Sequence, residues 1–199
     1  TFIDEINSET IEWQFENGLV DYLMDELEDR EIVPDPAYVA TGEGERASAE
    51  FAICWNAEGG EQVQESYVNL IPTAQGGTHV NGLRSGMTDA MREFCELRNL
   101  LPRNMKLSAE DVWDGVNYIL SLKFQEPQFS GQTKERLSSR EASNIMLNIA
   151  KDAFALWLNQ NSDVAMQLAE MMIAKAGRRL KAAKKVERKK IVADRKSVV

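Results

Sequence analysis

The chain has 199 residues, of which 43% are hydrophobic, and a formal net charge of -9 at pH 7. This length and apolar content suit one globular unit with a sizeable core, or two small ones. No apolar run approaches the roughly 20 residues that a membrane-spanning helix needs, so no membrane contact is expected. No secretory signal sequence is recognisable. The net acidity argues against strong nucleic-acid binding by the chain as a whole.

Charge is unevenly distributed along the chain. Residues 1–70 contain eighteen acidic and two basic residues, whereas residues 171–199 contain eleven basic and two acidic ones. A basic helical end is typical of a solvated connector, and less often of an arm that faces DNA.

The cysteine and histidine content limits the redox and metal chemistry. Cys54 and Cys95 stand far apart in apolar patterns, which suits buried thiols in a reducing cytosol better than a disulfide or a metal site. His79 is the only histidine, which excludes a His-rich metal cluster, and we expect it to anchor a loop. Because the chain begins at Thr1 rather than methionine, we expect it to be a piece of a longer protein.

The first half of the chain is predicted to contain strands and one helix. Residues 1–8 indicate a strand and a turn, residues 11–15 a half-buried strand, and residues 19–28 an amphipathic helix. A short extended piece is expected at 37–40, between prolines and glycines. Residues 49–55 and 64–70 read as strands that form a hairpin.

The second half is predicted to be mainly helical. Adjacent glycines at 76–77 indicate a special backbone conformation or close approach to another chain. A helix follows from Leu83, with Arg84 at its start. Ser108 and Asp111 predict an N-cap and a short helix, and residues 115–124 predict a strand.

A capping box at 138–141 predicts the start of the next helix. That helix is interrupted at 159–162 and followed by a longer one whose end is basic. Together the elements predict an α+β or α/β fold, with helices on one side of the strands and a long helical C-terminal extension.

One loop carries groups suited to phosphate chemistry. Residues 129–137 read Phe-Ser-Gly-Gln-Thr-Lys-Glu-Arg-Leu and lie between the last strand and a long helix. Gly131 permits a turn that other residues resist. Lys134 offers an ammonium suited to phosphate oxygens, and the Gln132 amide can donate to the same group. From spacing alone, a solvated surface lysine is the alternative interpretation.

In context, residues 127–140 resemble the Gln-Thr-Lys loop of the B subunits of bacterial type II topoisomerases. The stretches 65–84, 107–114 and 152–161 agree with this resemblance, in order and with similar spacing. It covers about residues 12–190 and favours the B subunit of topoisomerase IV over that of gyrase, which is the alternative.

The resemblance implies a transducer domain of a βαβ type known from ribosomal proteins (ribosomal protein S five domain two-like). It implies three parts: the end of a GHKL ATPase domain at 1–10, the transducer at 11–158, and a helix and basic connector toward a TOPRIM domain at 159–199. Gln132 and Lys134 would then contact the γ-phosphate of ATP, supported by Gly131 and Thr133. Arg84 would face the cavity that holds transported DNA.

The implied enzyme relaxes and decatenates DNA in the bacterial cytoplasm, at the nucleoid. Its implied cofactors are ATP and Mg²⁺, held mostly by other domains, so no catalytic or metal-binding residue is expected here. Implied partners are the ATPase and TOPRIM domains of the same polypeptide, a second B subunit, the A subunit of topoisomerase IV, and duplex DNA. The isolated chain is expected to be inactive.

Two functions of other classes remain as alternatives. One is a regulatory interaction module with an acidic front and a basic helix, which has no reason to carry four ordered topoisomerase-like blocks. The other is a stand-alone enzyme, which the lack of nucleophile–base pairing and of metal-ligand spacing disfavours.

Overall fold

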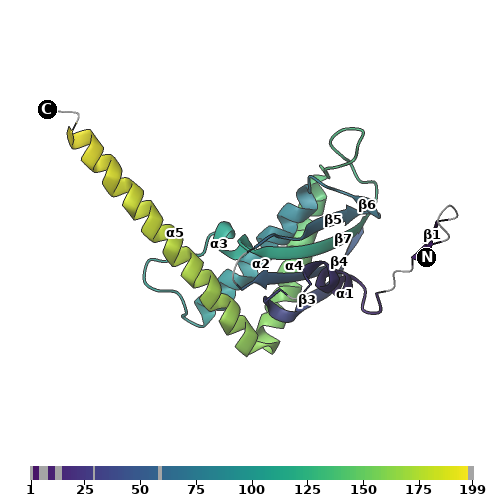
Figure 1. The fold of residues 1–199 in the computed structure, drawn as a ribbon, viewed down its shortest axis with the longest axis horizontal. Helices are drawn as coiled ribbons and strands as arrows, with labels where there is room; N and C mark the ends of the chain where they lie inside the picture. Colours follow the sequence, from purple (N-terminus) through teal and green to yellow (C-terminus); the bar gives the residue numbers. More distant parts are fainter. Residues whose placement is uncertain (1, 5–8, 12–14, 29, 58–59, 197–199) are drawn as a thin grey trace.

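A five-stranded sheet lies at the centre of the structure, a computed structural model that describes residues 2–4, 9–11, 15–28, 30–57 and 60–196. The strand order is β3-β4-β7-β5-β6 (Figure 1). The strands are β3 (Ile32–Gly44), β4 (Ala47–Asn56), β5 (Gln64–Val68), β6 (Ile71–Pro72) and β7 (Val116–Phe124). β4 and β7 pair antiparallel, which confirms the strands predicted at 49–55 and 115–124, and both are almost entirely buried.

Helices surround this sheet. They are α1 (Leu19–Leu27), α2 (Thr78–Leu97), α3 (Ala109–Trp113), α4 (Arg140–Gln160) and α5 (Ser162–Lys196). These bounds confirm the helix expected at 19–28 and the interruption at 159–162, and Ser108 with Asp111 forms the predicted cap of α3.

A separate two-stranded sheet lies near the N-terminus. In it β1 (Phe2–Asp4) pairs antiparallel with β2 (Glu9–Ile11). The strand expected within 1–8 is confirmed at Phe2–Asp4. Of the strand expected at 11–15, Ile11 lies in β2 but Phe15 lies outside any strand. The remaining residues of these two predictions (1, 5–8 and 12–14) lie outside the described ones.

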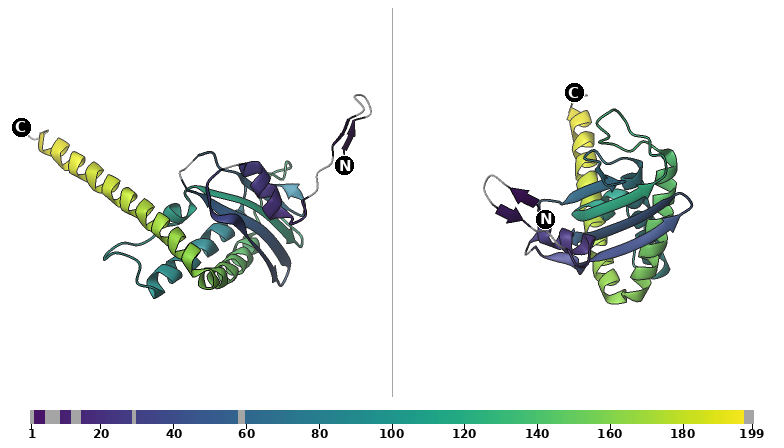
Figure 2. Two further views of the ribbon diagram at one scale, coloured as in Figure 1. Left: turned by 60° about the horizontal axis from the view of Figure 1, so that its bottom comes forward. Right: turned by 90° about the vertical axis from the view of Figure 1, so that its right-hand side faces the viewer.

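Helices cover both faces of the sheet, so the prediction of helices on one side is wrong. On β4, Phe51 and Ile53 point into the main core with α2 and α4. The intervening Ala52 and Cys54 pack in a second core with Leu23 of α1. Figure 2 shows α1 and α4 on opposite sides of the sheet. The second face exists because alternate side chains of β4 point to opposite sides and both sets are apolar.

The predicted hairpin between β4 and β5 does not form. β7 lies between them, antiparallel to β4 and parallel to β5. A parallel pair needs a long crossover, and here the chain passes through β6, α2 and α3 before it returns as β7. Local sequence indicated two strands and a turn, but the more apolar β7 occupies the central position.

The short extended piece expected at 37–40 is part of β3, which has 13 residues. Pro34 and Pro36 lie within this strand, at an irregularity in its pairing with β4 between Val33 and Tyr38. Proline is tolerated there because β3 is an edge strand, so one side of its backbone needs no sheet partner.

α2 and α4 pack at very short range through two glycines of α2. A Cβ added to Gly82 would overlap the Ser143 carbonyl oxygen, and one added to Gly86 would overlap the Leu147 carbonyl oxygen. Both glycines are buried. The absence of a side chain therefore sets the distance between these helices.

α5 leaves the sheet and projects away from it (Figure 1). Its first turns pack on the core through Ala165, Leu168 and Met172. Farther along, Arg179 forms two 2.8 Å contacts with the buried carboxylate of Asp111 in α3. Burial alone raises the pKa of Asp111, but Arg179 and Ser108 donate hydrogen bonds to it and hold its pKa below the usual range.

Replacement of Gly86 by alanine should destabilise the fold by about 1–3 kcal/mol, because the new methyl group collides with the backbone of α4. Helix propensity alone would make alanine more stable than glycine by up to ~1 kcal/mol. A net loss of stability in Gly86→Ala therefore shows that the collision with α4 outweighs this gain. Urea unfolding of Gly86→Ala beside Ser85→Ala, an exposed neighbour, measures it. Equal stability of the two variants would contradict close packing at Gly86.

Replacement of Arg179 by methionine should lower the free energy of unfolding by about 1–3 kcal/mol, because Asp111 stays buried without its charged donor. The matched control is Arg178→Met, which removes an exposed arginine next to it. Thermal and urea unfolding compare the two. Indistinguishable variants would show that the ion pair contributes nothing to docking of α5.

Candidate functional site

The candidate loop (residues 125–139, the Lys134 loop) joins β7 to α4 and extends beyond the sheet (Figure 1). At its apex (residues 131–134), Gly131 has φ 82 and Lys134 has φ 57. Glycine adopts this left-handed region readily, which confirms the predicted turn. The apex side chains are exposed, and a Cβ at Gly131 would meet nothing within 4 Å. The Gln132 amide and the Lys134 ammonium are thus presented to solvent.

Below the apex, the two arms of the loop pair with each other. The Ser130 N–H donates to the Arg136 carbonyl at 2.9 Å, and the Ser138 N–H donates to the Gln128 carbonyl at 2.8 Å. Phe129 and Leu137 form an antiparallel bridge between them. The apex therefore stands on a hydrogen-bonded stem.

The capping box predicted at 138–141 does not form. α4 begins at Arg140, and its N-cap Ser139 makes no side-chain capping bond. The Ser139 hydroxyl instead accepts from the Gln128 N–H at 2.8 Å, and the Ser138 hydroxyl donates to the Gln128 carbonyl at 3.0 Å. Both hydroxyls therefore bind Gln128 on the opposite arm and hold the stem.

A second loop (residues 73–77, the glycine loop) docks against the returning arm of the Lys134 loop. The Leu137 N–H donates to the Gly76 carbonyl at 3.0 Å, and the Thr78 N–H donates to the Leu137 carbonyl at 3.1 Å. A Cβ on Gly77 would overlap the Leu137 backbone. The predicted close approach is thus to another segment of the same chain.

Gln75 of the glycine loop contacts Glu135 at two points. Its backbone N–H donates to the Glu135 carbonyl at 2.9 Å, and its side-chain amide donates to the Glu135 carboxylate at 2.6 Å. Glu135 directly follows Lys134. The structure therefore joins two of the stretches that carry the topoisomerase resemblance.

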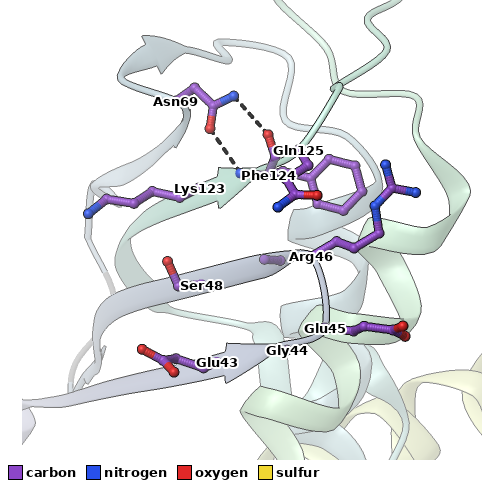
Figure 3. Close-up of a pocket in the computed structure, with 10 residues that line it drawn as sticks. Glu43, Gly44, Glu45, Arg46, Ser48, Asn69, Lys123, Phe124 and Gln125 are labelled. Carbon is purple, nitrogen blue, oxygen red and sulfur yellow. Dashed lines mark hydrogen bonds between the residues drawn. The ribbon is translucent and has the colours of Figure 1, made fainter.

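The start of the Lys134 loop is held at the end of β7. The Asn69 side chain accepts from the Phe124 N–H and donates to the Phe124 carbonyl, both at 2.9 Å (Figure 3). Arg46, in the turn between β3 and β4, lies 3.3 Å from the Glu126 carboxylate. Asn69, Phe124 and Arg46 line a groove of about 360 Å³. Their contacts fix the point where the loop begins.

Arg84 lies in the second turn of α2 and not at its start, because the helix begins at Thr78 rather than near Leu83. The glycine loop supplies the helix start that apolar spacing alone placed later. The Arg84 side chain is partly exposed. Among the described residues no hydrogen bond or ion pair joins its side chain to the Lys134 loop.

His79 is part of α2 and is fully buried. Its Nε2 lies 3.2 Å from the Thr73 hydroxyl, which in turn donates to the Ser66 carbonyl at 2.8 Å. Nδ1 has no partner among the described residues. Burial lowers the pKa of His79 to about 4, so the ring is neutral and supports the base of the glycine loop.

The described residues contain no cluster of three or more His, Cys, Asp or Glu side chains suited to a metal ion. None of the helices in those ranges has the length and apolarity to cross a bilayer. Both cysteines are free and buried, as predicted.

Comparison with known proteins identifies the family. A family model described as DNA gyrase B matches residues 18–188. The chain belongs to the DNA gyrase B family. The B subunit of DNA topoisomerase 4 from Pseudomonas aeruginosa is 60% identical over 190 residues, and that from Escherichia coli K12 is 56% identical over 191. Each match covers 96% of this chain and 30% of the relative, so the chain spans less than a third of these proteins.

Solved structures agree with this assignment. The topoisomerase IV ATP-binding domain of Francisella tularensis matches with a TM-score of 0.77 and 37% identity, over 89% of this chain and 48% of that one. The 43K ATPase domain of Thermus thermophilus gyrase B matches with a TM-score of 0.78 and 21% identity, over 86% of this chain and 46% of that one. At that identity the second match shows the fold alone.

In this member of the DNA gyrase B family, the sequence did not single out Gln75, Glu135, Asn69 or Arg46. Their types are common on surfaces, and their roles come from partners between 55 and 80 residues away. The adjacent glycines at 76–77 were the signal that the sequence offered for this contact. They predicted a close approach, but they did not indicate that the segment approached contains Leu137.

Stability of this gyrase B family chain should depend on the protonation of His79. The folded state holds the pKa near 4, below the ordinary value of 6.5, so protonation favours the unfolded state. The contribution of neutral His79 to the free energy of unfolding is complete above pH 6.5. It is lost as pH falls from 6.5 to about 4, by up to about 1.4 kcal/mol per pH unit. Urea unfolding between about pH 7.5 and pH 5 should show a weaker pH dependence for His79→Gln than for the parent chain. Parallel pH profiles would contradict a buried neutral histidine.

Proposed function

We propose that this chain is the transducer region of the B subunit of a bacterial topoisomerase IV. The observation that carries the proposal is the exposed apex of the Lys134 loop, which presents Gln132 and Lys134 on a hydrogen-bonded stem. Support comes from relatives named as the B subunit of DNA topoisomerase 4. Identities of 56% and 60% to these relatives favour topoisomerase IV over gyrase.

We infer the fold and the domain limits on the same basis. The five-stranded sheet with a parallel β5–β7 crossover is compatible with the ribosomal-protein-type βαβ fold. Residues 1–10 are assigned to the end of the ATPase domain, 11–158 to the transducer and 159–199 to the connector toward the TOPRIM domain. The end of α4 at Gln160 supports the second limit.

The apex fits the terminal phosphate of a nucleotide held by another domain. Lys134 offers a mobile cation and Gln132 a neutral donor, and the open space at Gly131 lets a ligand approach the backbone. ATP, with Mg²⁺, would supply the γ-phosphate that is cleaved. Lys134 would hold it in the ATP state and lose that contact after hydrolysis, which makes the loop a sensor of the nucleotide state.

The contacts below the apex provide a path into the rest of the chain. Leu137 is bonded to the start of α2, and α2 packs on α4 without intervening side chains at Gly82 and Gly86. α4 continues into α5 after one residue. Movement of the loop would therefore displace packed helices as a body.

The partners in this proposal are the ATPase and TOPRIM domains of the same polypeptide, a second B subunit, the A subunit of topoisomerase IV, and duplex DNA, in the bacterial cytoplasm at the nucleoid. The assembly would use ATP to relax and decatenate DNA. Arg84 remains the proposed contact with DNA in the cavity, and its partly exposed position on α2 is compatible with that role.

Lys134→Ala in the full-length protein should lower the kcat of ATP hydrolysis by about tenfold or more, because a charge that stabilises the phosphoryl transition state is lost. ATP binding should persist, since most ligands lie elsewhere. Steady-state turnover, nucleotide binding and nucleotide-dependent dimerisation are measured together. The control is Lys123→Ala, another exposed lysine at the end of β7. Unchanged turnover in Lys134→Ala would overturn the proposal.

A further inference from the structure

The apex of the Lys134 loop has little direct support, although its position decides where the Lys134 ammonium lies. A Cβ added at Gly131 would have no neighbour within 4 Å, and the apex side chains are exposed. Lys134 itself has φ 57, a region that residues other than glycine rarely occupy. A backbone in this region persists only when surrounding contacts hold it.

Gln75 holds the residue that follows Lys134. The next residue, Glu135, is bonded through both its carbonyl and its carboxylate to the backbone and side chain of Gln75. Two bonds to one residue restrict its rotation as well as its position. Glu135 is half-buried, whereas the apex and Arg136 are exposed. Glu135 is therefore the first residue after the apex whose side chain is fixed by the rest of the protein.

The Gln75 amide also fixes the direction of a negative charge. Its 2.6 Å bond holds the Glu135 carboxylate against the glycine loop. A freed carboxylate next to Lys134 would compete with a phosphate for the Lys134 ammonium, because opposite charges attract one another at short range.

We propose that Gln75 and Glu135 are positioning residues for Lys134, acting by holding the loop backbone and by keeping the Glu135 carboxylate away from the apex. This inference rests on the proposed phosphate contact of Lys134. It adds that the glycine loop, from a separate part of the sequence, prepares the Lys134 loop before a nucleotide binds.

The test uses the full-length protein with the variants Gln75→Ala, Glu135→Ala, Glu135→Gln, Lys134→Ala and the double variant Gln75→Ala with Lys134→Ala. Gln62→Ala is the matched control, because Gln62 is an exposed glutamine bonded only to Gln64 among the described residues. Thermal unfolding verifies that each variant is folded.

The first readout needs no nucleotide. Hydrogen exchange of the peptide containing residues 128–138 should be about tenfold faster in Gln75→Ala and Glu135→Ala, because opening of the loop becomes easier. Gln62→Ala and Glu135→Gln should exchange like the parent protein, since Glu135→Gln keeps an acceptor for the Gln75 amide.

The second readout is single-turnover ATP hydrolysis, with steady-state kinetics beside it. Gln75→Ala and Glu135→Ala should lower kcat about tenfold with little change in KM, because they displace a group used in the transition state. Gln75→Ala should add nothing in the Lys134→Ala background, since a residue that acts only through Lys134 has no effect without it.

The outcomes separate the two proposals. If Lys134→Ala does not slow turnover, the phosphate contact fails, and this inference fails with it. If Lys134→Ala slows turnover but Gln75→Ala leaves exchange and turnover unchanged, only the positioning role is overturned. If Gln75→Ala lowers turnover further in the Lys134→Ala background, the positioning role is also overturned, because the substitution then has a general structural effect.

Discussion

The pairing of Leu137 with Gly76 and Thr78 is the constraint on which the arrangement of the candidate site depends. Two backbone hydrogen bonds join the returning arm of the Lys134 loop to the residues that start α2. The contact is possible because Gly77 has no side chain, and any Cβ there would overlap the Leu137 backbone. Backbone bonds of this kind fix a loop more firmly than surface side chains do, since they hold two stretches of main chain in register.

The same absence of side chains continues along α2. Gly82 and Gly86 bring α2 against the backbone of α4, so the glycine loop and the returning arm of the Lys134 loop are connected through one helix pair. Glycine within a helix costs about 1 kcal/mol relative to alanine, and the close packing offsets that cost. In the proposed function, a loop mounted on such a pair would transmit displacement, because closely packed interiors deform little.

Acidic and basic residues gather in different parts of the chain. The acidic first third contains α1, β3 and β4, whereas the basic residues gather in α5, whose side chains at 181–185 are exposed. The pair of Arg179 and Asp111 holds the middle of α5 to the core. Beyond it the helix extends away from the sheet (Figure 1).

Local patterns were sufficient for most elements. The apolar runs of β4 and β7, the amphipathic stripe of α1, the cap of α3 and the turn at Gly131 depend on neighbours within a few residues, and sequence alone determined them. The position of the Lys134 loop between a strand and a helix followed in the same way. The resemblance to the B subunits of type II topoisomerases then indicated a chemistry for Gln132 and Lys134 that composition does not contain.

Tertiary structure decided the features that depend on distant partners. β7 separates β4 from β5 and buries its apolar residues at the centre of the sheet, and α1 occupies the second face because alternate residues of β4 are also apolar. Ser138 and Ser139 bond to Gln128 instead of capping α4, and Gln75 meets Glu135 across 60 residues. Sequence records which groups can form such contacts, but the choice among partners is made only when the chain brings them within hydrogen-bonding distance.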